Sequence, residues 1–195
     1  MTSCRSLPLL FCLTLTALLG LAMGGCSSTS HDIKPIDPLT DLKPYHVIQV
    51  EKVVAEEGVI VPDDVLANST AKISANLTKK GTFRAVVQNP PTEMPYARLS
   101  VHVAQYEPGS RVARAMLIGL GTATFKLNVT VSDGATGKVL AAGDLTEFWG
   151  WGGLAGASRG IEDLVNDGCD HTANGVSRTF AKYANSNHFT AYYSQ

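Results

Sequence analysis

The chain has 195 residues, 45% of them hydrophobic, and a formal net charge of −1 at pH 7. The near-neutral charge argues against nucleic-acid binding and against electrostatic attraction to anionic lipid, because both need a strongly basic surface. A globular part of about 140 residues is enough to bury one hydrophobic core.

Residues 1–25 have the three parts of a secretion signal. Arg5 supplies the positive charge of the first part, and residues 7–21 form a leucine-rich apolar core. This core is too short for a membrane-spanning helix, which needs about 20 apolar residues. Small residues then precede a cysteine in Met-Gly-Gly-Cys, residues 23–26, the pattern of a lipobox. We therefore expect cleavage before Cys26 and attachment of acyl chains to this residue.

Acyl chains on Cys26 would hold the protein at a membrane, since each buried methylene contributes about 0.8 kcal/mol and two or more chains anchor stably. Ser27 stands where an aspartate would retain a lipoprotein of a Gram-negative bacterium at the inner membrane. This resembles the pattern of lipoproteins of the outer membrane. The sequence thus predicts a lipid-anchored protein of the cell envelope, at the outer membrane and facing the periplasm.

The segment after the lipidated cysteine, residues 26–44, is polar and carries prolines at positions 35, 38 and 44. Prolines remove hydrogen-bond donors that a strand needs, so this composition favours a flexible tether over a first strand. Residues 45–195 then form one periplasmic domain. Residues 1–25 would leave with the signal, so the only thiol besides Cys26 is Cys169, and no intramolecular disulfide is possible.

The first half of the domain predicts a strand and a helix. Residues 45–54 are rich in β-branched side chains, which is typical of a strand. Residues 62–80 have helical spacing of apolar residues and complete end signals. These signals are Pro62, Asp63 and Asp64 at the start and Lys79, Lys80 and Gly81 at the end.

The second half predicts strands followed by a long helix. The expected strands are 83–88, 98–106, 123–132 and 139–148, the last two joined by a turn at 133–138. Apolar residues recur at helical spacing over 158–184, where Gly168 and Gly175 would allow close approach to the sheet. The order predicts a single α+β domain, with an antiparallel sheet and two packing helices.

Three groups of residues are candidates for chemical sites. Cys169 and His171 lie two apart on a helix and so do not face each other, which favours a buried, inert thiol. Asp167, Asp170 and His171 have the spacing of metal ligands on one helix face, but such clusters are ordinary on solvated faces. Gly119 and Gly121 lack the lysine of a phosphate-binding loop. We therefore predict no metal, no nucleotide or other cofactor and no catalytic residue.

The glycine-rich segment Phe148-Trp149-Gly150-Trp151-Gly152-Gly153-Leu154 is the best candidate for a contact surface. Aromatic side chains on such a loop can insert into a partner protein or a membrane interface. Alternatively, Phe148 and one tryptophan cover the end of the sheet. Phe148, Trp149 and Trp151 are therefore the candidate partner contacts.

Residues 108–151 resemble a family of bacterial lipoproteins known as domain of unknown function 4410. The similar features are Gly-Ser-Arg at 109–111, Arg114, the pair Gly119 and Gly121, and the hairpin from Asp133 through Val139. The order of strands and helices extends the resemblance over about residues 45–184. It implies an envelope lipoprotein and transfers no catalytic residue.

The sequence leaves three functional hypotheses. The first is a non-catalytic outer-membrane lipoprotein whose periplasmic domain binds an unidentified envelope protein. The second is a subunit of an oligomeric secretion or pore assembly, since residues 123–132 are long enough for a tilted barrel strand of about 9–11 residues. The third is a hydrolase with dispersed catalytic residues.

Overall fold

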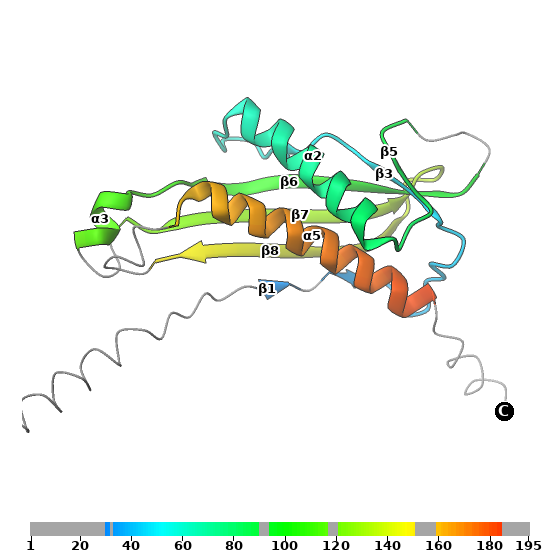
Figure 1. The fold of residues 1–195 in the computed structure, drawn as a ribbon. Helices are drawn as coiled ribbons and strands as arrows, with labels where there is room; N and C mark the ends of the chain where they lie inside the picture. Colours follow the sequence, from blue (N-terminus) through cyan, green and yellow to red (C-terminus); the bar gives the residue numbers. More distant parts are fainter. Residues whose placement is uncertain (1–29, 32, 90–93, 117–120, 151–158, 185–195) are drawn as a thin grey trace, which may run out of the picture.

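A computed structural model describes residues 30–31, 33–89, 94–116, 121–150 and 159–184. These residues form one sheet with two long helices on one face and a short helix at one end (Figure 1). The strands are β1 Ser30–His31, β2 Lys34–Pro35, β3 Val47–Val50, β4 Val54–Ala55, β5 Ala85–Val87, β6 Tyr96–Glu107, β7 Ala123–Asp133 and β8 Val139–Trp149. The helices are α2 Asp63–Lys80, α3 Arg111–Met116 and α5 Ile161–Ala184.

The sheet is mixed, which corrects the expectation of an antiparallel sheet. Strands β6, β7 and β8 form an antiparallel meander, and β7 and β8 are joined by the predicted turn. Strand β3, however, runs parallel to both β5 and β6. The reason is that α2 lies between β4 and β5 in the chain. A helix of this length carries the chain back to the start of the sheet, so the next strand runs in the same direction. The single α+β domain itself is confirmed.

Helix α2 begins and ends where its sequence signals predict. It starts directly after Pro62, with Asp63 and Asp64 in the first turn, and it ends at Lys80. Gly81 follows in the left-handed conformation, with φ of 66°, and its N–H donates to the carbonyl of Thr78. Acidic residues at the positive end of the helix dipole and a terminal glycine are the usual determinants of such boundaries.

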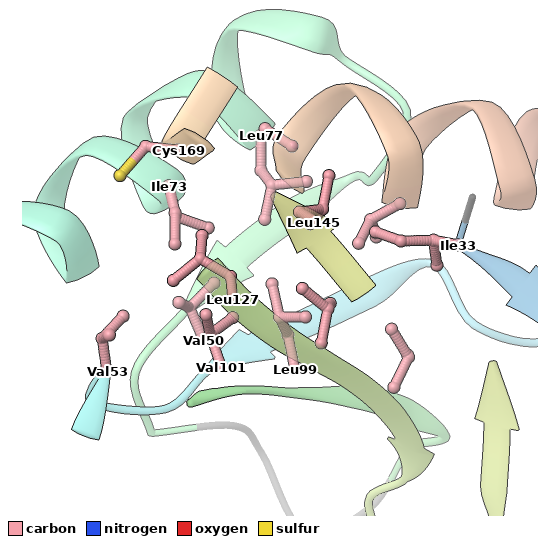
Figure 2. Packing of buried hydrophobic residues seen from close by; sticks show 14 of the residues in the cluster. Ile33, Val50, Val53, Ile73, Leu77, Leu99, Val101, Leu127, Leu145 and Cys169 are labelled. Atoms are coloured by element: carbon pink, nitrogen blue, oxygen red, sulfur yellow. The ribbon is translucent and has the colours of Figure 1, made fainter. Parts of the chain in front are cut away.

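The core lies between the sheet and the two long helices (Figure 2). Alternate residues of β6 and β7 point toward the helices, as their period of two predicts. On α2, Ile73 and Leu77 are fully buried against them. The sheet residues of this layer are Leu99, Val101, Val103, Phe125, Leu127, Val129 and Val131, none more than 1% exposed. Full burial of each large apolar side chain contributes about 1.5–3 kcal/mol.

The two glycines of α5 mark close contacts, and Gly168 approaches the sheet as expected, whereas Gly175 approaches the N-terminal segment instead. A Cβ atom at Gly168 would lie 3.0 Å from the ring of Phe125, on β7. One at Gly175 would lie 2.8 Å from the Cδ1 atom of Ile33, just before β2. Helix α5 therefore contacts the sheet through one glycine and the N-terminal segment through the other.

The expected tether over residues 26–44 is wrong from Ser30 onward. Strands β1 and β2 pair antiparallel with β8 along the edge of the sheet. Ile33, between them, is only 6% exposed, and Leu42 is 1% exposed. Pro35 is tolerated because proline is compatible with an edge strand, where a missing N–H costs no central ladder bond. Prolines therefore do not exclude a short strand at the edge of a sheet.

The sequence did not predict helix α3. Two glycines, one before and one after this helix, allow the flanking backbone segments to meet. Gly109 has φ of 61° and Gly121 has φ of 71°, both favourable only for glycine. A Cβ atom at Gly109 would lie 2.1 Å from the carbonyl oxygen of Thr122, and one at Gly121 would lie 2.4 Å from that of Ser110. The backbones on either side of α3 thus meet at van der Waals distance, with the Ser110 N–H donating to the Gly121 carbonyl.

Candidate functional site

The aromatic residues at the end of β8 point to opposite faces of the sheet. Trp149 is partly buried against the core, and the guanidinium of Arg159 lies 5.1 Å from the centre of its ring. Phe148, its neighbour on the strand, is 38% exposed. Trp149 therefore packs against the core, as one of the two alternatives expected. Phe148 faces outward and stays a candidate contact. Trp151 and Cys26 lie outside the described residues.

A groove of about 430 Å³ lies between the N-terminal segment and α5. Its floor includes Ile33 and Gly175, and basic side chains surround it: Lys34 from β2, and Arg178 and Lys182 from α5. Arg178 and Lys182 are four residues apart, so they share one helix face. Among the described residues that line the groove, none is acidic. The groove is therefore suited to an anionic group, although residues 26–195 carry 15 basic and 17 acidic side chains.

His171 lines the same groove and contacts Glu147, which the sequence analysis did not connect with it. Its Nδ1 atom lies 2.7 Å from Oε1 of Glu147, a residue on β8 that is 5% exposed. The carboxylate fixes the orientation of the imidazole, as a buried acid does for histidines in many sites. No sequence signal joined these two residues, because they are 24 positions apart and on different elements.

The two aspartates of α5 that have the spacing of metal ligands contact different residues. Asp167 pairs with Arg159 at 3.1 Å, while Asp170 accepts a hydrogen bond from Asn174. Within the described part of the chain, no group of three or more His, Cys, Asp or Glu side chains could hold a metal ion.

Cys169 is fully buried, as the apolar face of its helix predicted. Burial raises the pKa of its thiol to about 11, and its Sγ atom lies 3.8 Å from the carbonyl oxygen of Ser69. A thiol in this environment stays protonated at neutral pH and is a poor nucleophile.

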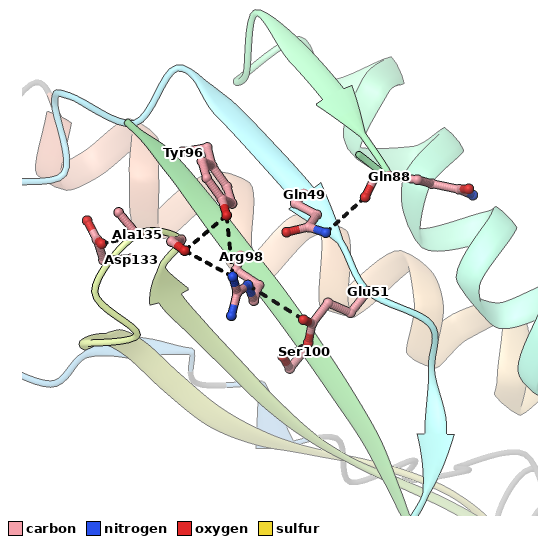
Figure 3. A network of polar contacts seen from close by, with 9 residues as sticks. Gln49, Glu51, Gln88, Tyr96, Arg98, Ser100, Asp133 and Ala135 are labelled. Atoms are coloured by element: carbon pink, nitrogen blue, oxygen red, sulfur yellow. Dashed lines mark hydrogen bonds and ion pairs between the residues drawn. The ribbon is translucent and has the colours of Figure 1, made fainter. Parts of the chain in front are cut away.

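The face of the sheet away from the helices is polar and carries a network centred on Arg98 (Figure 3). Its Nη2 atom donates to the carbonyl of Gly134 at 2.9 Å, and its Nε atom lies 3.5 Å from a carboxylate oxygen of Glu51. Glu51 also accepts a hydrogen bond from the hydroxyl of Ser100. The network connects the end of β3, β6 and the turn after β7.

The fold and these surfaces define a class, a two-layer α+β domain with a mixed sheet covered on one face by helices. The chain belongs to the family described as domain of unknown function 4410, whose model matches residues 38–153. No protein of curated function matches the sequence.

Two solved structures share this fold at low sequence identity. The PelC dodecamer from Paraburkholderia phytofirmans has a TM-score of 0.51 and 12% identity, over 79% of this chain and 98% of that chain. Protein XCC0632 from Xanthomonas campestris, of the family DUF330, has a TM-score of 0.50 and 13% identity, over 78% and 95%. Among the described residues, no helix is both long and apolar enough to cross a membrane.

Proposed function

We propose that this protein is a lipoprotein anchored to the outer membrane through acyl chains on Cys26. Its domain faces the periplasm and binds another envelope protein without catalysing a reaction. The observation that carries this proposal is the lipobox, Met-Gly-Gly-Cys at residues 23–26. Ser30, the first residue that the structure describes, pairs with β8 only four positions after Cys26. Lipid on Cys26 would therefore lie close to the sheet.

The groove between the N-terminal segment and α5 is the best-supported surface for the partner. Three basic side chains from two elements surround it, and its floor is apolar. This combination suits an acidic segment of a protein, because opposite charges give specificity while the apolar floor contributes burial. Arg178 is exposed, so it is available to such a segment.

Photo-crosslinking in cells tests the partner. A photoreactive amino acid in place of Arg178 should form an adduct with an envelope protein, and the charge reversal Lys182→Glu should weaken that adduct. The matched control is the same photoreactive residue in place of Lys138, which is exposed in the turn after β7. Adducts that are absent at 178, or equally strong at 138, would contradict a specific contact at the groove.

A second candidate is a subunit of an oligomeric assembly, and the shared fold with a solved dodecamer favours it. In this case the photoreactive residue at position 178 should crosslink to a second copy of the chain. Native mass spectrometry of the detergent-solubilised wild-type protein separates the two candidates. A single oligomer of defined mass supports the assembly, whereas a monomer supports the lipoprotein with a different partner.

A further inference from the structure

The direction of β1 determines where the anchor lies relative to the domain. Ser30 pairs with Thr146 and His31 with Leu145, so β1 runs antiparallel to β8. The N-terminal side of Ser30 therefore faces the end of β8 that carries Trp149. The four residues from Cys26 to Ser30 span at most about 14 Å. The three from Thr146 to Trp149 advance about 10 Å. Together these two lengths keep Cys26 within about 24 Å of the end of β8.

The surface near this point has two exposed apolar residues. Helix α3 lies at the end of the sheet where β8 ends, opposite the turn between β7 and β8 (Figure 1). Val112 on α3 is 65% exposed, and Phe148 on β8 is 38% exposed. The basic residue beside Val112, Arg111, pairs with Glu162 at 2.9 Å, so its charge is balanced. We define the α3–β8 end as Arg111–Met116 together with Phe148–Trp149.

We propose that the α3–β8 end rests on the lipid surface, with Val112 and Phe148 in the apolar part of the interface. The proposal builds on lipidation of Cys26, since the short link is what brings this end to the membrane. Partly exposed aromatic and aliphatic side chains suit the boundary between headgroups and acyl chains. Because Arg111 is paired, the contact does not require anionic lipid.

The opposite end of β8 then points away from the membrane. Val139 begins this strand and is 40% exposed. Trp149 lies ten positions further along the strand, a distance of about 30 Å. Val139 is thus a matched control, being apolar and exposed on the same strand but at its opposite end.

Fluorescence quenching in vesicles tests this orientation. The full-length lipidated protein, with Val112→Cys, Phe148→Cys or Val139→Cys, is labelled with a thiol-reactive fluorophore in phosphatidylcholine vesicles. Cys169 is buried and the sulfur of Cys26 carries lipid, so only the introduced thiol reacts. Lipids with a nitroxide should quench the labels at 112 and 148 and leave the label at 139 unquenched. Iodide in the water should give the opposite order.

Equal lipid quenching at 139, or quenching of 112 and 148 by iodide alone, would overturn the orientation. A flexible Gly-Ser spacer inserted after Ser28 should reduce lipid quenching at 112 and 148 while the protein stays on vesicles. Unchanged quenching would exclude the short link as its cause. Photo-crosslinks from position 148 to a protein instead of lipid would also overturn the proposal. Failure of lipidation is a separate outcome, visible beforehand as an unacylated mass.

Discussion

The hydroxyl of Thr179 donates a 2.7 Å hydrogen bond to the main-chain carbonyl of Ile33. The bond joins α5 to the segment between β1 and β2, across 146 positions of the chain. Both residues are buried, and the side chain of Ile33 fills the space above Gly175. The N-terminal segment is thereby part of the folded domain and forms one wall of the basic groove.

Ile33→Ala should lower the free energy of unfolding by about 2 kcal/mol, near the lower end for buried isoleucine because the site is at the edge of the core. Ile36→Ala is the matched control. Ile36 is 62% exposed, so its loss should change stability by no more than about 0.5 kcal/mol. Urea denaturation of both variants measures the difference. Equal effects would mean that residues 30–36 behave as a free tether.

Gly109→Ala should destabilise the protein more than Gly137→Ala. Both glycines have positive φ, 61° and 72°, so each alanine incurs about 1–2 kcal/mol of backbone strain. Only at Gly109 does the new methyl also meet a backbone oxygen, that of Thr122, whereas nothing lies within 4 Å at Gly137. Overpacking adds about 1–3 kcal/mol. Thermal unfolding of the two variants gives the comparison, and equal losses would refute the close approach at the base of α3.

Tyr45 and Asp133 should make stability depend on pH at both extremes. The hydroxyl of Tyr45 donates to Oδ2 of Asp133 at 2.6 Å. This bond, with those from Thr136, lowers the pKa of Asp133 from 3.8 to about 2. Burial, followed by the same bond, raises the pKa of Tyr45 from 10.0 to about 12.

The sign follows from which state binds more protons. Between pH 4 and 2 the unfolded chain binds a proton at Asp133 that the folded protein does not, so this contribution to stability is lost as the pH falls. Between pH 10 and 12 the folded protein keeps the proton of Tyr45, so stability falls as the pH rises. Tyr45→Phe should flatten the alkaline loss and reduce the acid loss. Denaturation at a series of pH values measures both, and an unchanged profile would contradict the bond.

Cys169 should resist alkylation in the folded protein. Its thiol is fully buried and its pKa is raised to about 11, so very little thiolate exists at pH 8. Iodoacetamide should therefore modify Cys169 only after denaturant is added, as followed by intact mass. Rapid modification without denaturant would show that α5 opens easily or that the thiol lies nearer the surface.

Local signals predicted the two long helices and the long strands, because each of these elements depends on residues close in sequence. The acidic start and glycine end of α2, the alternation of β7 and the apolar face that buries Cys169 all belong to this group. The glycines of α5 were also informative, since Gly168 and Gly175 have few reasons to stand in a helix other than close packing.

Long-range pairing was not predictable from one sequence. The parallel direction of β3 depends on how α2 crosses the sheet. Strands β1 and β2 have two residues each, and their pairing depends on β8, more than 100 positions later. The pair Glu147 and His171 likewise depends on how α5 crosses β8. None of these leaves a periodic signal in the chain.

Mass spectrometry of the mature N-terminus tests lipidation of Cys26 most directly. The protein is expressed at full length, extracted from membranes and digested, with Cys26→Ala and the matched signal variant Cys12→Ala alongside. We predict a terminal peptide that begins at residue 26 and carries the added mass of acyl chains in the wild type and in Cys12→Ala. In Cys26→Ala this peptide should be absent. A mature chain that retains residues 1–25, or that begins at an unmodified Cys26, would contradict the anchor.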